Sequence, residues 1–413
     1  MRDAVVDHSR RWYRVAGAAG LTDGDVVRPT VFAEMSALAT RTGALNLGQG
    51  FPDSDAPAHL LAAATRAIEA GHNQYPPGPG VPALREAVAT HQARRYGIDV
   101  DPASEVLVTA GATEAITAAV LALAGPGDEV LTLEPWYDSY AAAIALAGAT
   151  HTTVPLTRDG DRFRLDPVAV RAAVGPRTRV VVLNTPHNPT GTVLGREDLA
   201  PLVEALAAVP DAVVVTDEVY EHLTYGAVRH VPPATLPGLA GRTLTVSSAG
   251  KTFSVTGWKI GWVHGPAALV EAVQAVKQYL TYVSGGPFQH AVAEVLADDD
   301  GRTAVWVEEL RTSLERRRDL LCAGLADAGF DVVVPDGTYF VVADAAPLGF
   351  DDGDALCRRL PELAGVVAVP VSAFCRPGAP AAADLASSVR FTYVKQEPVL
   401  EEAVRRLRGL RAR

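Results

Sequence analysis

A lysine among small, hydroxylated and aromatic residues is the feature of this sequence with the clearest chemical meaning. Lys251 lies in the segment Ser247–Ser254, which reads Ser-Ser-Ala-Gly-Lys-Thr-Phe-Ser, and Gly257–Trp262 follows it. Such neighbours can exclude water from the amine and favour the neutral form that attacks a carbonyl carbon to form an imine. Because most lysines that follow a strand are solvated surface groups, this interpretation depends on the other motifs.

Two polar segments follow apolar, strand-like runs. In Thr216–Tyr220, Asp217 comes where ligands collect in open α/β sheets, and it can pair there with a protonated ring nitrogen. Tyr220, three residues later, can face the same crevice, although an isolated Asp in this place would usually cap a turn. In Asn184–Gly191, two X-Pro steps restrict the loop that presents Asn188. The alternative is that this loop is only a structural turn.

The segment Thr109–Ile116 predicts a turn of small residues that leads from a strand into a helix. Gly111, Ala112 and Thr113 would lie at the start of that helix, where free amides attract anions. The segment matches neither a Walker loop nor the Gly-x-Gly-x-x-Gly fingerprint of dinucleotide-binding domains. From the residues alone, a phosphate site and a plain helix cap both remain open.

Short apolar runs alternate with helical patterns along the chain, and the strands and helices that they predict must position these segments. The strand-like runs are at residues 106–109, 129–133, 152–155, 180–183, 212–216, 244–247 and 260–263. They predict an α/β protein whose large domain has a mostly parallel, seven-stranded sheet flanked by helices. Later helices and strands predict a smaller α+β domain. We expect an N-terminal arm with part of the small domain over residues 1–56, the large domain over 57–297 and the small C-terminal domain over 298–413.

Composition limits the partners and the compartment. The 413 residues are 48% hydrophobic and 21% charged, which suits a large ordered core. The formal net charge of −11 disfavours nucleic acid and anionic membranes as partners. Three cysteines without a Cys-x-x-Cys pair fit a reducing cytoplasm and argue against a disulfide framework or a zinc site, so no metal site is predicted. No stretch is apolar enough to span a bilayer.

Together the motifs resemble those of fold-type I, pyridoxal-phosphate-dependent aminotransferases of the class I/II group, over roughly residues 30 to 410. Eight motifs occur in the family's order: Leu47–Asp53, Asn73–Tyr75, Ala110–Glu114, Glu134–Tyr137, Asn188–Gly191, Asp217–Tyr220, Ser248–Lys251 and Arg390-Phe391. Within the family, the chain resembles kynurenine/glutamine aminotransferases with cysteine-conjugate β-lyase activity and actinobacterial N-succinyldiaminopimelate aminotransferases. The resemblance implies that the large domain binds pyridoxal 5′-phosphate.

The resemblance also implies a role for each residue around the cofactor ring. Lys251 would bind the cofactor aldehyde and then move the substrate Cα proton, and Asp217 would keep the ring nitrogen protonated. Asn188 and Tyr220 would bond the ring hydroxyl oxygen, and Tyr137 would stack on the ring face.

The remaining implied roles concern the phosphate and the substrate. The phosphate would be held by Gly111, Ala112, Thr113, Ser248, Lys259 and, from a neighbouring subunit, Tyr75. That last contact implies a homodimer with shared active sites. Arg390 would bind the substrate α-carboxylate in a bidentate pair, beside the Gly50 backbone and Asn188, and Phe32 would border the side-chain pocket.

We therefore predict an aminotransferase that moves an amino group from an L-amino acid to a 2-oxo acid such as 2-oxoglutarate. A cysteine-S-conjugate β-lyase would use the same cofactor residues, so the sequence leaves it open as the alternative. A non-catalytic binding domain is disfavoured by the full catalytic set. The aromatic pocket walls of the kynurenine-type enzymes are missing at Thr113-Glu114 and Ser284–Pro287, so the amino donor is not predicted.

Overall fold

An eight-stranded mixed sheet forms the centre of the protein. The structure is a computed structural model that describes residues 10–24, 26–298 and 300–412. The strand order is β4-β11-β10-β9-β8-β5-β6-β7. The strands are β4 (Val106–Thr109), β5 (Glu129–Glu134), β6 (Thr150–Asp159), β7 (Arg162–Leu165), β8 (Thr178–Asn184), β9 (Val213–Asp217), β10 (Thr243–Ser248) and β11 (Gly261–His264). The five strands from β10 to β6 pair in parallel, whereas β11 and β7 run antiparallel to their neighbours.

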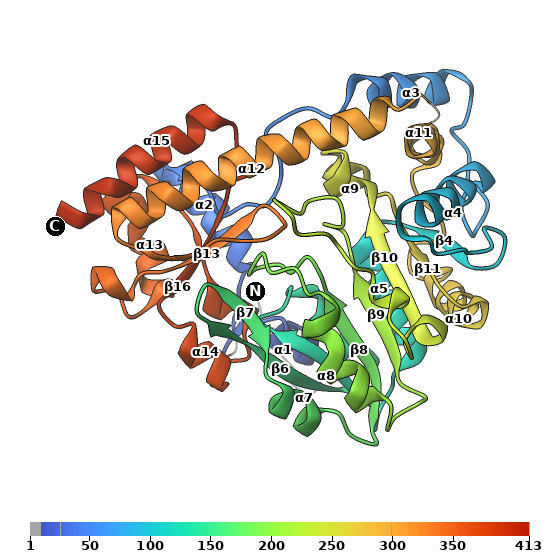
Figure 1. Cartoon of the computed structure of the whole chain (residues 1–413), viewed down its shortest axis with the longest axis horizontal. Helices are drawn as coiled ribbons and strands as arrows, with labels where there is room; N and C mark the ends of the chain where they lie inside the picture. Colours follow the sequence, from blue (N-terminus) through green and yellow to red (C-terminus); the bar gives the residue numbers. More distant parts are fainter. Residues whose placement is uncertain (1–9, 25, 299, 413) are drawn as a thin grey trace, which may run out of the picture.

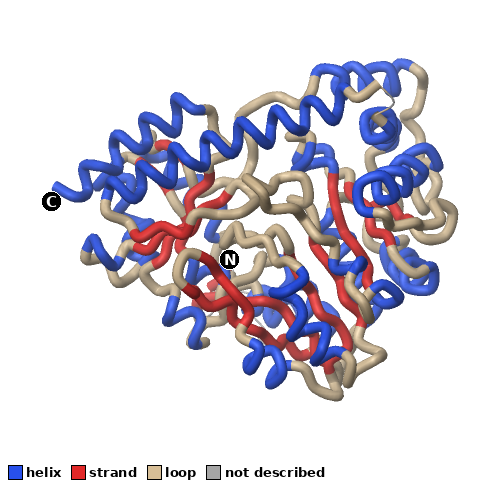
Figure 2. Tube along the Cα trace, in the orientation of Figure 1, coloured by secondary structure: helices blue, strands red, loops and turns tan. Residues whose placement is uncertain are grey.

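The sheet is covered by helices on both faces (Figures 1 and 2). Successive strand residues point to opposite faces, so Val180 and Val182 pack in one apolar cluster and Val181 and Leu183 in another. One face is covered by α5 (Ala112–Leu123), α6 (Ser139–Ala147) and α10 (Ala267–Lys277). The other is covered by α7 (Pro167–Ala173), α8 (Arg196–Leu206), α3 (Ala58–Glu69), α4 (Pro82–Tyr96) and α11 (Gly286–Ala297).

A second, antiparallel sheet lies beside the first, in the order β12-β13-β16-β15. It consists of β12 (Asp331–Val333), β13 (Phe340–Asp344), β15 (Val369–Pro370) and β16 (Ser388–Thr392). The pair β3 (Leu45–Asn46) and β14 (Val366–Val367) joins the N-terminal part of the chain to this region. Its helices are α2 (Val31–Thr42), α12 (Arg302–Ala328), α13 (Gly353–Ala364), α14 (Pro380–Asp384) and α15 (Glu397–Leu407). Figure 1 shows α12 running beside α15 and reaching toward α3 and α11.

The predicted α/β class and the mostly parallel sheet are confirmed, but the predicted number of seven strands is wrong. The eighth strand, β7, forms an antiparallel hairpin with β6 at the sheet edge. It alternates charged and apolar residues, Arg-Phe-Arg-Leu, and therefore lacks the continuous apolar pattern of the buried strands. The domain boundaries at residues 56 and 297 stay predictions.

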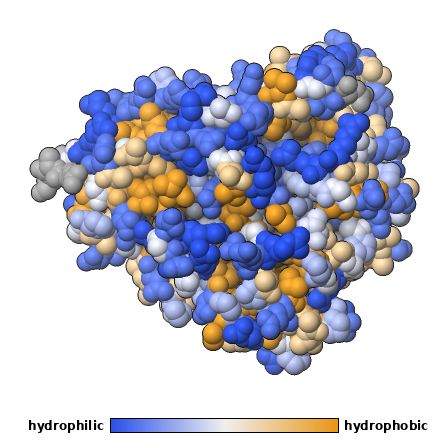
Figure 3. All heavy atoms as spheres, viewed as in Figure 1, coloured by the Kyte–Doolittle hydropathy of each residue, from blue (hydrophilic) through white to orange (hydrophobic). Residues whose placement is uncertain are grey.

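The predicted N-terminal arm contains α1 (Arg11–Ala18) and a hairpin of β1 (Thr22–Asp23) and β2 (Val26–Val27). Residues 1–9 of that arm lie outside the described residues. The helix α1 packs against α6. Hydrophilic residues cover much of the face drawn in Figure 3, with apolar residues in separate patches. Among the described residues, no helix combines the length and apolar character needed to cross a membrane.

Candidate active site

A cavity of about 370 Å³ lies where the parallel strands end. Every site residue predicted from the sequence lines it, with the exception of Tyr75. These residues are Phe32, Gly50, Gly111, Ala112, Thr113, Tyr137, Asn188, Asp217, Tyr220, Ser248, Lys251, Lys259 and Arg390. Tyr75 is instead 80% exposed, and its ring contacts that of Tyr282 at a centroid distance of 5.6 Å. The structure thus gathers segments that are up to 358 residues apart, from Phe32 to Arg390, around one space.

The carboxylate of Asp217 is buried at the end of β9, on the floor of the cavity. Burial raises its pKa from 3.8 to about 6. The Tyr140 hydroxyl opposes this shift by donating a 2.5 Å hydrogen bond to Oδ2, as do the Val219 amide and the positive charge of Lys251. Asp217 is therefore a carboxylate that a nearby cation can readily keep ionised.

Lys251 lies on α9 (Ala249–Thr252), the short helix that directly follows β10. Because β10 and β9 are neighbours, with Val246 opposite Asp217, the lysine and the carboxylate enter the cavity from adjacent strands. The Lys251 ammonium is 5.8 Å from the ring centroids of both Tyr220 and Tyr339. An amine held among aromatic rings and beside a carboxylate can form a covalent bond to a carbonyl ligand in the cavity.

Arg390 brings a buried cation from β16 of the second sheet. Its Nη1 donates to Asn188 Oδ1 at 2.9 Å and its Nη2 to the Gly48 carbonyl at 2.8 Å. Its Nε has no hydrogen-bond partner among the described residues. Burial lowers the pKa to about 10, so the guanidinium remains charged at neutral pH. The orphaned donor, on a guanidinium packed among the rings of Phe32, Phe340 and Phe374, favours an anionic ligand at this place.

Asn188 links this arginine to the backbone of Asp217 on β9. The Asn188 backbone amide donates to Asn184 Oδ1 at 2.7 Å, and Asn184 Nδ2 donates to the Asp217 carbonyl at 2.8 Å. Asn184 is the last residue of β8, so a strand end fixes the loop that carries Asn188. Hydrogen bonds of side chains thus fix the position of Arg390 relative to the end of β9.

An anion-binding corner lies at the start of α5. Gly111 precedes the helix with φ of +80°, and the first amides of the helix have no intrahelical acceptor. A Cβ at Gly111 would lie 3.4 Å from the Lys259 Nζ and would fill this corner. Ser248 and Thr113 also line the cavity. Backbone amides, hydroxyl groups and an ammonium make a site suited to a phosphate group.

Several residues of the site were not predicted from the sequence. Tyr140 lies in the first turn of α6, whereas Tyr137 precedes that helix, so helical periodicity does not connect the two tyrosines. No sequence signal marks Tyr339 and Phe340, which reach the cavity region from the second sheet. Gly50 lines the cavity, and a Cβ there would collide with the Phe340 ring, so packing also requires glycine at this position. The approach of a substrate to its backbone stays a prediction.

Comparison with known proteins places this site in a family. The sequence profile described as "Aminotransferase class I and II" matches residues 42–407. The chain belongs to this family. The aminotransferase is 56% identical over 388 residues to the Mycobacterium tuberculosis protein named "Probable N-succinyldiaminopimelate aminotransferase DapC", covering 93% of this chain and 96% of the relative. It is 36% identical over 394 residues to kynurenine–oxoglutarate transaminase 3 of Mus musculus, covering 90% and 86% of the two chains.

A solved structure agrees with these relationships. The structure of N-succinyldiaminopimelate aminotransferase from Mycobacterium tuberculosis matches with a TM-score of 0.88 and 55% identity, covering 92% of this chain and 97% of that chain. The predictions of a transaminase, of fold type I and of dependence on pyridoxal phosphate are therefore confirmed.

The cavity fits this cofactor group by group. Pyridoxal 5′-phosphate has a phosphate for the corner of amides beside Lys259, and a basic ring nitrogen for Asp217. Its aldehyde matches the amine of Lys251, and Tyr137 offers a flat ring at the cavity wall. The unpaired Nε of Arg390 is left for a second anion, which a substrate carboxylate can supply.

Proposed function

We propose that this aminotransferase binds pyridoxal 5′-phosphate covalently through Lys251 and uses the same amine to move the substrate proton. The observation that supports this proposal is the shared position of Lys251 and Asp217. They enter one cavity from adjacent strands, and the charge of Lys251 counteracts the rise in the pKa of Asp217 that burial causes. The competing lysine in the cavity, Lys259, lies instead beside Gly111 at the phosphate corner.

The chain's own residues would divide the remaining tasks. When bound, the cofactor supplies an aldehyde that captures the substrate amine and an electron-withdrawing ring. Asp217 holds a proton on the ring nitrogen, while Tyr220 and Asn188 donate hydrogen bonds to the ring oxygen. Arg390 binds the α-carboxylate and thereby orients the Cα–H bond. Lys251 Nζ would then take the Cα proton and pass it to the carbon that carried the cofactor aldehyde, and the second half of the cycle would reverse this transfer onto the 2-oxo acid carbon.

We propose N-succinyldiaminopimelate as the amino substrate and 2-oxoglutarate with glutamate as the second pair. The 56% identical relative carries that substrate in its name, over 93% of this chain. Residue 113, which lines the cavity, is a threonine and not an aromatic residue, which favours a pocket with room for a long side chain. Once Lys251 and Lys259 serve the cofactor, Arg390 is the only arginine or lysine left in the described lining. Additional carboxylates of the substrate therefore need a cation from elsewhere.

A second copy of the chain can provide such groups, and we propose a homodimer that works in the cytoplasm. An aromatic patch consists of Tyr75, Tyr279, Leu280 and Tyr282, with Tyr75 80% and Tyr279 84% exposed. Lys277 ties its two segments together through the carbonyls of Gly78 and Tyr282. Exposed aromatic groups of this kind favour a protein interface. The three cysteines are free, buried thiols, which suits a reducing compartment.

Donor specificity tests the substrate proposal directly. N-succinyldiaminopimelate, methionine and kynurenine would each be offered with 2-oxoglutarate, and glutamate would be measured as the product. We expect kcat/KM for N-succinyldiaminopimelate to exceed that of the other two donors by at least about tenfold, or about 1.4 kcal/mol. Equal values, or a preference for kynurenine, would contradict the substrate proposal and leave the cofactor chemistry intact.

Light scattering tests the proposed homodimer. The same sample should give twice the mass of one chain.

A further inference from the structure

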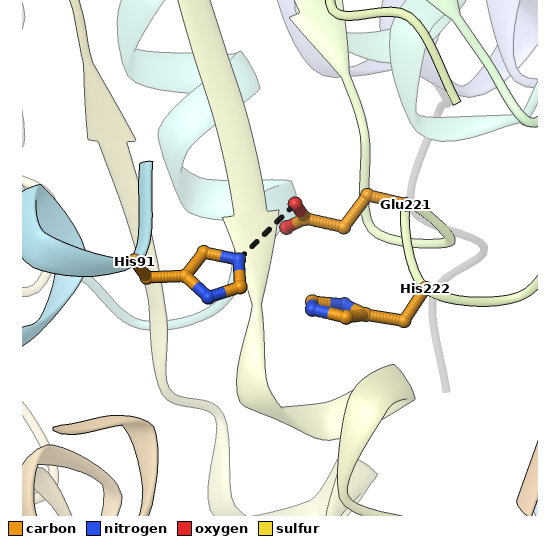
Figure 4. Close-up of side chains that lie close together, drawn as sticks. All are labelled: His91, Glu221 and His222. Atoms are coloured by element: carbon orange, nitrogen blue, oxygen red, sulfur yellow. Dashed lines mark hydrogen bonds and ion pairs between the residues drawn. The ribbon is translucent and has the colours of Figure 1, made fainter. Parts of the chain in front are cut away.

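Three potential metal ligands meet behind the active site, on the side of the sheet covered by α4. His91 comes from α4, and Glu221 and His222 come from the segment that follows Tyr220 (Figure 4). One ligand atom of each residue lies within 4.8 Å of those of the other two, and His91 Nε2 is 3.5 Å from Glu221 Oε2. Figure 4 shows the two rings and the carboxylate directed toward one another.

Hydrogen bonds from neighbouring residues orient two of the three side chains. Ser247 Oγ donates to Glu221 Oε1 at 2.6 Å, which leaves Oε2 directed at the histidines. His222 Nδ1 is 3.3 Å from Thr252 Oγ1, so its Nε2 is the free ligand atom. A hydroxyl or carboxylate that fixes the second nitrogen or oxygen of a ligand is the usual support of a metal site.

The Glu221 carboxylate is buried, and although burial opposes ionisation, the neighbouring His222, His91 and Ser247 hold its pKa well below its usual range. The carboxylate is 1% exposed, and among the described residues its only ion-pair partner is His91, which carries charge only when protonated. Two arginines line the adjacent cavity, but neither forms an ion pair with Glu221: Arg95 donates a hydrogen bond to the Tyr96 hydroxyl, and Arg311 pairs with two glutamates of α12. A buried carboxylate beside two imidazoles favours a bound cation.

A separate cavity of about 170 Å³ gives access to this cluster. His91 and His222 both line it, together with Thr252, Arg95 and residues of α12. His91 is also the partly exposed member of the three, with 13% of its side chain accessible. A zinc ion with bonds of about 2.0–2.2 Å needs ligand atoms about 3.3–3.5 Å apart. His91 and Glu221 already have this separation, whereas the three ligand atoms together lie within 4.8 Å, so an imidazole has to move inward slightly. The cavity beside its ring leaves room for that movement.

We propose that His91, Glu221 and His222 bind one divalent transition-metal ion of the zinc class. Two imidazole nitrogens and one carboxylate oxygen suit Zn²⁺, Co²⁺ or Ni²⁺ better than Mg²⁺ or Ca²⁺, which prefer all-oxygen sites. Water could supply a fourth ligand from the 170 Å³ cavity, which His91 and His222 line. The ion would fasten α4 to the segment that carries Asp217 and Tyr220, and through Thr252 to the helix of Lys251.

Cobalt serves as the probe, because the visible bands of four-coordinate Co²⁺ report a site directly. The holoenzyme would be treated with a chelator, titrated with Co²⁺, and its metal content measured by mass spectrometry after gel filtration. We expect one ion per chain in the wild type. His91→Asn and Glu221→Gln should each weaken binding by at least about 100-fold, because each removes one of three ligands.

The surface provides a matched control. His72 and His290 stack at a centroid distance of 3.7 Å and could take up metal adventitiously. His290→Asn should leave the bound cobalt and its spectrum unchanged. Absence of a bound equivalent in the wild type, or cobalt affinity that survives His91→Asn, would overturn the proposal. Because His91 is partly exposed, the His91→Asn variant should keep the wild-type circular dichroism spectrum. It therefore tests the proposal even if Glu221→Gln fails to fold.

Discussion

Replacing Asp217 by Asn should make the cofactor-free protein more stable while it impairs the enzyme. Burial raises the pKa of Asp217 from 3.8 to about 6 in the folded chain, a difference of about 2 units. Each unit corresponds to about 1.4 kcal/mol, so the ionised carboxylate costs the cofactor-free fold about 3 kcal/mol. Asparagine has nearly the same shape, can still accept the Tyr140 hydrogen bond, and does not ionise.

The sign of the effect depends on pH. Between pH 4 and 6 the folded chain holds the Asp217 proton more tightly than the unfolded chain does. Raising the pH through that window therefore lowers the stability of the wild type but not that of Asp217→Asn. The variant should match the wild type below about pH 4 and exceed it above about pH 6, by about 3 °C in Tm for a chain of 413 residues.

Differential scanning calorimetry of both cofactor-free proteins at pH 4.5 and pH 8 measures this effect. The difference in stability between the wild type and Asp217→Asn at each pH removes the contribution of the other titrating groups, which both proteins share. With pyridoxal phosphate added, the order should reverse, since Asp217 then pairs with a cationic ring. A gain of equal size at both pH values, or no gain at pH 8, would refute the view that burial of this charge is costly.

Three further predictions concern neighbouring residues. Tyr140→Phe removes the 2.5 Å hydrogen bond to Asp217, which should raise the Asp217 pKa above about 6 and weaken cofactor binding at neutral pH about tenfold, as read from the dissociation constant. Lys259→Met removes the ammonium beside Gly111 and should weaken cofactor retention about 10–100-fold in dialysis, whereas an unchanged dissociation constant would exclude Lys259 from the phosphate corner. Arg390→Lys keeps the charge but loses the bidentate geometry, so KM for the amino substrate should rise at least about tenfold with the cofactor spectrum unchanged; an unaltered KM would contradict the assigned carboxylate contact.

The buried strands could be predicted from the sequence because they are continuous apolar runs between turns. The predicted run at 106–109 coincides with β4. The ends of the predicted runs at 244–247 and 260–263 each differ by one residue from those of β10 and β11. Their carboxyl ends carry Asp217, Ser248 and Gly111, so the strands also place the cofactor side of the cavity. The edge strand β7 escaped prediction because its face alternates between charged and apolar residues.

What the sequence could not predict depends on contacts between distant segments. Phe340 enters the cavity from the second sheet, and nothing in its surroundings distinguishes it from a core residue. The His91 and Glu221 side chains are 130 residues apart, and only the packing of α4 against the sheet brings them together. The sequence predicted no metal site because the cysteine spacing was the only signal used. Cysteine spacing says nothing about a cluster of histidine and glutamate.

The covalent attachment of the cofactor to Lys251 is the claim on which the rest depends. The purified holoenzyme would be reduced with borohydride, digested and examined by peptide mass spectrometry. The added mass of the reduced cofactor should appear on the peptide residue Lys251 and be absent from Lys259, the other lysine of the cavity. Modification of Lys259 in place of Lys251, or no modified lysine in a protein that contains bound cofactor, would contradict the account.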